Sequence, residues 1–167
     1  FVLDEKTGPW SVSGGRLRGG TIEVKAGGGL SLQSAATLES MKLRGMVQAD
    51  QYETVRLTGG LDLAGGTLRI PGGRLEILDT QTIEGGTVEL LGSGAWSYLA
   101  ISAQKILTLS ATTVLRGGPG WVQGEGTLRN LGTIRADVPG QTLRIRPAVF
   151  LNEGTVIAAN GGILDMP

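Results

Sequence analysis

The sequence contains no cysteine and no histidine. Without cysteine there are no disulfide bonds, no thiolate metal ligands and no thiol nucleophile. Without histidine, the commonest general base and the commonest protein metal ligand are both missing. These two absences remove most routes to metal binding and to covalent catalysis, so we expect neither a metal nor a cofactor.

Aromatic residues are also scarce, at 4% of the chain, and the apolar residues are mainly aliphatic. This composition favours a narrow core of stacked aliphatic layers. No apolar run approaches the ~18 residues that a membrane-spanning helix needs. Fifteen basic residues balance fifteen acidic ones, and such a neutral, mixed surface gives no electrostatic footprint for nucleic acid or an anionic membrane. We therefore expect no nucleic-acid partner and no membrane insertion.

What the chain does have is glycine, and a phrase that repeats. The 167 residues include 29 glycines, without the three-residue period of collagen. The phrase GGTIEV at 19–24 returns as GGTLRI at 65–70 and as GGTVEL at 85–90. Two glycines make a tight bend, and the alternating apolar and polar residues that follow are typical of a short strand. Shorter versions occur at 126–128, 132–134 and 154–156.

The spacing of this phrase predicts a solenoid. The segment 17–21 aligns with 63–67, and the next copy follows at 83–87. An echo of 16–19 at 42–47 divides the first, longer interval in two. Repeats at this spacing indicate stacked coils. We predict roughly six to eight coils of 20–26 residues in a single domain, 15–167, that is irregular at 91–126 and follows an N-terminal cap or lead-in at 1–14.

Each unit contains three short runs with apolar residues at every second position, such as 21–24, 29–32 and 36–39. Period two places one face inward and one outward. The sequence thus predicts an all-β fold, a right-handed parallel β-helix (β-solenoid). A propeller blade needs longer units, and the six-residue rhythm of a left-handed hexapeptide helix is absent. An ordinary sandwich leaves the repeated phrase unexplained. We interpret 34–43 as strand, although Ser34 could also cap a helical turn.

Asn130 and Asn152 occupy equivalent positions in two segments that align with each other, 128–136 and 150–158. Asparagines at one turn of stacked coils can form a hydrogen-bonded ladder. The alternative is that each asparagine was selected for its tolerance of left-handed backbone. Both interpretations are structural.

These last two segments, LRNLGTIRA and FLNEGTVIA, resemble the L-x-N-x-G-T-I coils of large bacterial surface proteins. Filamentous haemagglutinin-like adhesins and autotransporter passenger domains contain such coils. The resemblance extends from about residue 15 to residue 164. It implies a secreted or cell-surface bacterial rod that serves adhesion or display. Those families define no shared site on their coils, so it carries over no functional residue.

The acidic residues do not form the clusters that catalytic or calcium-binding β-helices need. Glu23, Glu84 and Glu89 alternate along the chain with basic residues that include Arg16, Arg18 and Arg69. This pattern suggests ion pairs across neighbouring coils on a solvated face. The glycine-rich stretches at 27–29 and 117–120 lack the residues that complete a phosphate-binding loop. We expect no enzyme, with a carbohydrate-active enzyme kept as an alternative.

The candidate binding residues are Trp96, Tyr98 and Trp121, which lie in the irregular region 91–126. Irregular loops on a regular rod are a common place for function. Aromatic faces could stack on sugar rings or anchor a protein contact. The alternative is that the rings pack on a neighbouring coil. Trp10 is expected to cover the open N-terminal end.

The leading functional hypothesis is a non-catalytic spacer segment of a larger secreted or cell-surface bacterial protein of adhesin type. We favour a fragment, because the repeat is already running by residue 17 and still running near the last residue. Its expected partners are further coils or domains of the same parent chain, and open terminal coils could associate end to end. A binding module that recognises carbohydrate or a host or neighbour-cell protein is the second hypothesis.

Overall fold

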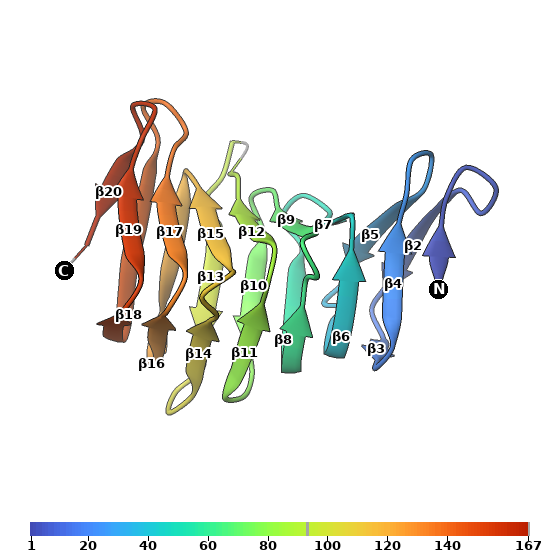
Figure 1. Ribbon diagram of the computed structural model, residues 1–167, viewed down its shortest axis with the longest axis horizontal. Helices are drawn as coiled ribbons and strands as arrows, with labels where there is room; N and C mark the ends of the chain where they lie inside the picture. Colours follow the sequence, from blue (N-terminus) through green and yellow to red (C-terminus); the bar gives the residue numbers. More distant parts are fainter. Residues whose placement is uncertain (93, 167) are drawn as a thin grey trace.

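The structure of the chain, a computed structural model, describes residues 1–92 and 94–166. These residues form twenty strands and no helix. All strand pairings are parallel, and the strands stack into a rod with the two termini at opposite ends (Figure 1). The chain is therefore an all-β parallel β-solenoid, as the sequence predicts. Crossover connections between parallel strands are almost always right-handed, which is the basis for expecting a right-handed winding. Ser93, inside the predicted irregular region, and Pro167 lie outside the described residues.

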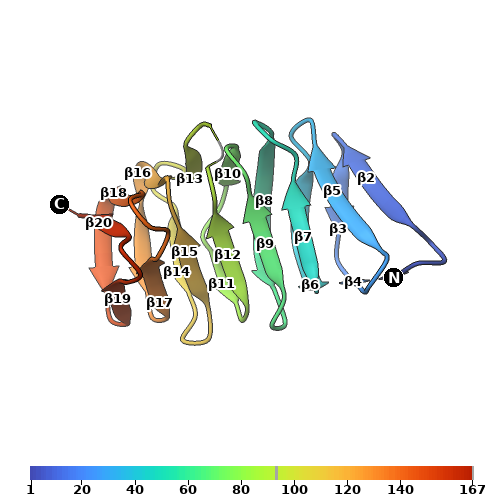
Figure 2. The same cartoon turned by 90° about the horizontal axis from the view of Figure 1, so that it is seen from above.

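One side of the rod is a continuous eight-stranded sheet (Figure 2). Each of its strands comes from a different coil, so the sheet counts eight coils and confirms the upper end of the predicted six to eight. Its strands, in spatial order, are β2 (Pro9–Ser13), β5 (Gly29–Gln33), β7 (Met46–Ala49), β9 (Thr67–Ile70), β12 (Thr87–Leu90), β15 (Val114–Gly117), β17 (Thr133–Ala136) and β19 (Thr155–Ala158).

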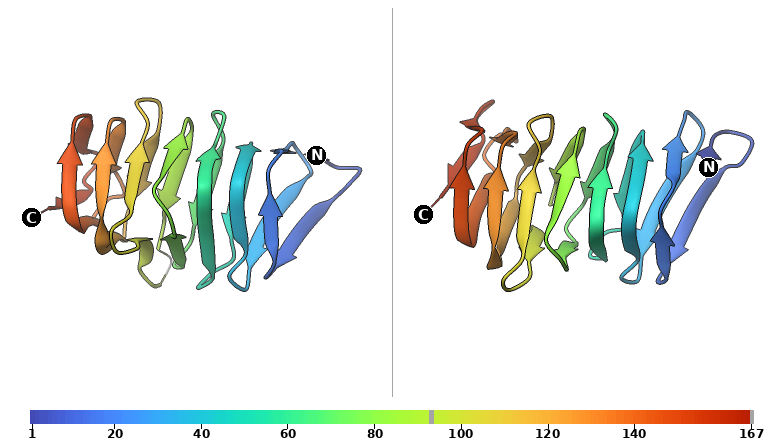
Figure 3. Two further views of the ribbon diagram at one scale, coloured as in Figure 1. Left: turned by 90° about the horizontal axis from the view of Figure 1, so that it is seen from below. Right: turned by 60° about the horizontal axis from the view of Figure 1, so that its bottom comes forward.

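The other twelve strands form a second sheet that bends into two faces (Figure 3). Four long strands run across the bend, while in the other coils a short break separates the two faces. The long strands are β6 (Thr37–Arg44), β8 (Thr54–Asp62), β16 (Gly120–Asn130) and β18 (Thr142–Asn152). The short ones are β1 (Val2–Leu3), β3 (Arg16–Arg18), β4 (Thr21–Val24), β10 (Arg74–Ile77), β11 (Gln81–Glu84), β13 (Ser97–Ile101), β14 (Ile106–Leu109) and β20 (Ile163–Asp165).

The core consists of aliphatic rows that run along the rod. In the eight-stranded sheet one such row is in register from β7 to β17. Every member of it is fully buried. Each buried side chain of this size contributes about 1.5–3 kcal/mol, so the rows supply the main stabilisation of the stack. The row comprises Val47, Leu68, Val88, Leu115 and Ile134.

The coils vary in length more than the sequence predicts. In the eight-stranded sheet the shortest step joins Ser31 to Gln48, and the longest joins Thr87 to Val114. The longest step is above the predicted range, whereas the shortest step and the step from Val114 to Thr133 are below it. The strands of neighbouring coils still pair in parallel, so the extra or missing residues of a coil lie in the turns between its strands. The segment 34–43, which we interpreted as strand, forms most of β6. Residues 1–14 contribute β1 and β2, which pair with β4 and β5.

The alignment of the repeated phrase is correct in one step and wrong in another. Thr67 and Thr87 are direct partners in the eight-stranded sheet, as the alignment of their two phrases predicts. Thr21 instead enters β4 in the other sheet, where its partner is Lys42. Arg16 pairs with Thr37, so the predicted echo at 42–47 is also out of register. The reason is that a glycine bend followed by a strand can occupy any corner of a coil, so the phrase does not specify which face follows.

Candidate functional site

A row of outward side chains runs across neighbouring coils on the second sheet, and its central members are Tyr98, Trp121 and Arg144. Tyr98 of β13 is the partner of Trp121 of β16, and Trp121 is the partner of Arg144 of β18. The row continues to Arg74 of β10 on one side and to Asp165 of β20 on the other. Because neighbouring strands lie about 4.8 Å apart, the side chains of such a row are in mutual contact distance.

Trp96 joins this row from the turn that precedes β13. Its ring centroid lies 6.1 Å from that of Trp121, and the Tyr98 ring lies 6.2 Å from Trp121 on the other side. The Arg144 guanidinium lies 4.8 Å from the Trp96 ring centre and 5.4 Å from that of Trp121. We call Trp96, Tyr98, Trp121 and Arg144 the aromatic cluster. All four side chains are half-buried, so the predicted binding residues come together and also pack across coils.

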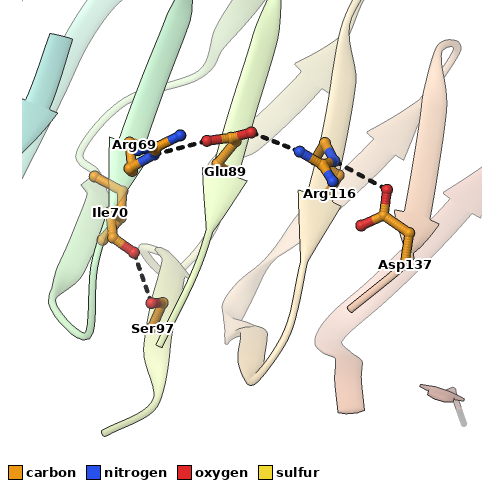
Figure 4. A network of polar contacts seen from close by, with 6 residues as sticks. All are labelled: Arg69, Ile70, Glu89, Ser97, Arg116 and Asp137. Carbon is orange, nitrogen blue, oxygen red and sulfur yellow. Dashed lines mark hydrogen bonds and ion pairs between the residues drawn. The ribbon is translucent and has the colours of Figure 1, made fainter. Parts of the chain in front are cut away.

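A buried hydroxyl fixes the start of β13 beside this cluster. Ser97 is fully buried, and its Oγ donates a hydrogen bond to the carbonyl of Ile70 at 2.6 Å (Figure 4). The same oxygen accepts a hydrogen bond from the backbone N–H of Gly72 at 2.9 Å. These two bonds attach β13 to the preceding coil, and they hold the residues on either side of Ser97, Trp96 and Tyr98, at a constant position.

Two shallow hollows lie at the two ends of β13, on either side of the aromatic cluster. The first, of about 390 Å³, lies over the C-terminal end of β13. The second, of about 360 Å³, lies at the turn before β13. Residues lining the first include Arg74, Glu76, Ala100, Ser102, Gln123 and Glu125. Those lining the second are Gly92, Gly94, Ala95, Trp96, Pro119 and Gln141.

The eight-stranded sheet carries a chain of ion pairs that crosses three coil boundaries (Figure 4). Glu89 is 7% exposed and binds Arg69 of the preceding coil at 2.8 Å and Arg116 of the following coil at 2.6 Å. Arg116 also binds Asp137 at 2.9 Å. Hydrogen bonding to Asp137, aided by Glu89, raises the pKa of the Arg116 guanidinium above its ordinary value. Every charge in this network has a partner on a neighbouring coil, and its role is to hold coils together.

The prediction that ion pairs join neighbouring coils is therefore confirmed, but only some of the residues named for these pairs form them. The pair of Glu89 with Arg69 is confirmed. Arg16 and Arg18, however, both bind Glu39 rather than Glu23, because β3 stacks on β6. Glu23 binds Lys25 on its own coil at 3.9 Å.

The ion pair between Lys42 and Asp62 gives the first prediction. The two side chains are 2.7 Å apart, and the hydrogen bond from Lys42 lowers the pKa of Asp62 below its ordinary 3.8. Its stabilisation is therefore present above pH 3.8 and is lost as the pH falls through the lowered pKa. Lys42→Met should cost about 0.5 kcal/mol at pH 7, measured by urea unfolding. The variant should also lose less stability than the parent between pH 5 and pH 2, and an equal loss would contradict this assignment.

Asn130 and Asn152 are partners on neighbouring coils. The Nδ2 of Asn130 donates to the Oδ1 of Asn152 at 2.7 Å, and the Oδ1 of Asn130 accepts from the backbone N–H of Gly132 at 3.2 Å. Neither asparagine is among the described residues with positive φ. The buried Asn130 side chain thus satisfies bent backbone and links two coils.

Within residues 1–92 and 94–166, no three histidine, cysteine, aspartate or glutamate side chains gather as a group that could hold a metal ion. The same residues contain no helix long and apolar enough to cross a membrane.

Sequence reasoning missed Arg144 and Gln123 as neighbours of the aromatic residues. A signal for Arg144 was present, since Tyr98, Trp121 and Arg144 are equally spaced along the sequence. That spacing becomes informative only once the coil boundaries are known. Comparison of the chain with protein-family models, with curated proteins and with solved structures found no match. Functional inference therefore depends on the geometry of the chain itself.

Proposed function

We propose that this chain is a structural spacer segment of a larger secreted or cell-surface bacterial protein of adhesin type. The observation that carries the proposal is the unbroken row of outward partners on the eight-stranded sheet. This row keeps its register through all eight coils despite the variation in coil length. A stack with constant register holds a fixed length, which is the property that a spacer needs. The resemblance of its last coils to those of bacterial surface proteins supports the setting.

The two ends of the rod support the expectation that further coils cover them. Trp10 faces inward as the partner of Leu30, yet it is 50% exposed and packs against Phe1, with 4.8 Å between the ring centroids. At the other end Val156, the partner of the fully buried Ile134, is only half-buried. β2 and β19 are the terminal strands of their sheet, so each leaves one edge free to pair. Such ends fit a further coil, from the same parent chain or from a second copy.

The ends give the second prediction. Ala158 lies on the terminal strand β19 and faces inward as the partner of the buried Ala136, but it is itself exposed. Residues 1–167 alone should associate end to end, and sedimentation velocity should show a sedimentation coefficient that rises with concentration. Ala158→Lys places a charge on the open core and should suppress this rise. Ile157→Lys, on the outward side of the same strand, should leave it unchanged. A wild type that stays monomeric at the highest soluble concentration would contradict the proposal of a covered end.

The location of the protein can be tested separately. Antibodies against residues 1–167 should label intact cells that produce the parent protein, or should detect the chain in their culture medium. Labelling that appears only after the cells are lysed would contradict a secreted or cell-surface location.

A further inference from the structure

We propose that the groove along β13, together with the aromatic cluster, binds a neutral glycan built from hexopyranose units. The proposal concerns the side of the rod and is independent of what covers its ends. It combines four features of the described residues: a gap in a row of long side chains, an aromatic surface beside the gap, polar groups without partners, and the balance of charge.

The gap arises because Ala100 is short. Its partners on the neighbouring coils are Glu76 of β10 and Gln123 of β16, and all three side chains point outward. The two longer side chains form walls, and β13 between them forms the floor. The walls lie two strand spacings apart, or about 9.6 Å, a width that suits a single extended polymer. From Ala100 to Ser102 the open floor extends about 7 Å, which is room for one sugar unit with its neighbours continuing beyond it, and the Tyr98 side chain closes the floor at its other end.

The aromatic cluster gives one end of this groove an apolar surface. Tyr98 and Trp121 stand beside the gap, two positions before Ala100 and Gln123 on the same strands. One face of a hexopyranose ring presents aliphatic C–H groups, which pack against the electron-rich face of an aromatic ring. The Nε1 of Trp121 is buried and has no hydrogen-bond partner among the described residues, so packing within the aromatic cluster leaves this donor unsatisfied.

The polar groups of the groove match sugar hydroxyls. The side chains of Gln123 and Glu125 make no hydrogen bond or ion pair with any residue in the described part of the chain. Glu76 holds Arg74 at 3.0 Å and Arg56 at 3.2 Å, so it is fixed in place at the opposite wall. A hydroxyl both donates and accepts, and it can therefore bind an amide and a carboxylate at once. Packing of the aromatic rings alone explains neither the open gap nor these unused groups.

The charge of the groove selects a neutral ligand. Its lining residues include one basic side chain, Arg74, and two acidic ones, Glu76 and Glu125. Arg144 lies nearby, but its guanidinium is held against the two Trp rings and by Asp165 at 3.2 Å. Glu76 is paired with both Arg74 and Arg56, so Glu125 is the charged lining residue without a partner in the described part of the chain. Its carboxylate would repel an anionic polymer at close range. A uronic-acid polymer is thus disfavoured relative to a neutral one.

The experiment is native affinity electrophoresis in gels that contain hydroxyethyl cellulose, galactomannan, dextran or polygalacturonate, supported by an array of neutral oligosaccharides. The wild type should be retarded by at least one neutral polysaccharide and not by polygalacturonate. Trp121→Ala should weaken the binding at least tenfold. Trp10→Ala, which removes an aromatic ring outside the groove, should bind as the wild type does.

A second variant separates binding from folding. Ala100→Arg fills the groove with a side chain that can pair with Glu76, as Arg56 already does, so the coil should fold normally by circular dichroism. It should abolish retardation while the aromatic cluster remains intact. The proposal is overturned if no neutral glycan binds, if polygalacturonate alone retards the wild type, or if folded Ala100→Arg binds as strongly as the wild type does.

Discussion

Replacing Gly45 by alanine should destabilise the chain by about 3–5 kcal/mol, close to the largest effect expected of a single residue. Gly45 has φ +78° and joins β6 to β7 at a corner of the coil. A Cβ atom there would overlap the carbonyl oxygen of Val24 on the preceding coil. About 1–2 kcal/mol of the loss comes from the left-handed backbone, and the rest comes from forcing two coils apart. Chemical denaturation measures the total.

Gly19→Ala is the matched control. Gly19 has φ +63°, and a Cβ atom there would meet nothing within 4 Å. This variant carries the same backbone strain without a clash between coils, so it should lose only about 1–2 kcal/mol. Equal losses in the two variants would mean that the coils do not approach each other closely at Gly45.

The second large effect is expected at Glu89. Glu89→Ala removes the carboxylate that binds both Arg69 and Arg116. Loss of one partner from a buried ion pair typically costs about 3–5 kcal/mol. Because the two arginine side chains are about one-third exposed, water replaces part of the lost interaction, and we expect about 2–4 kcal/mol. Thermal and urea unfolding of the variant at neutral pH measure this loss.

The comparison for Glu89 is Glu153. Glu153 also binds an arginine of the preceding coil, Arg129, at 2.7 Å, but about half of its side chain is exposed. Its pKa is lowered by the hydrogen bond from Arg129, yet exposed pairs add little to stability. Glu153→Ala should therefore change the unfolding free energy much less than Glu89→Ala. If the two variants were equally destabilised, burial of the ion-pair network would not be the cause of its strength.

The sequence was sufficient to predict the fold class because period-two runs and glycine bends are local signals. The partner of Thr87 could be found by aligning its phrase with that of Thr67, since the two phrases lie on the same face of neighbouring coils. The partner of Thr21 could not be found in this way, because the register depends on the number of residues in each turn of the coil. The short step from Ser31 to Gln48 and the long step from Thr87 to Val114 have no local signature.

The aromatic residues of the candidate site were predicted from the sequence, but the residues that surround them were not. Trp96, Tyr98 and Trp121 stood out because aromatic residues are rare in this chain. Ala100 gave no such signal, since a single alanine in a strand has no unusual chemistry. It becomes important only between Glu76 and Gln123, two residues from other coils. Properties that depend on the partners of a residue across coils are visible only in the structure.

The coils stack in constant register along the rod. Ser11, Gln48 and Ile157 are outward members of one row on the eight-stranded sheet. Because the chain has no cysteine, Ser11→Cys/Ile157→Cys and Gln48→Cys/Ile157→Cys can be spin-labelled at those positions alone. The backbone separations expected from seven and five strand spacings are about 34 and 24 Å.

Double electron–electron resonance on the two labelled proteins measures these separations directly. A rod of stacked parallel coils should give two narrow distance distributions whose centres differ by about 10 Å, the length of two strand spacings. Two distributions with the same centre, or a single broad distribution for either pair, would contradict a rod of stacked parallel coils.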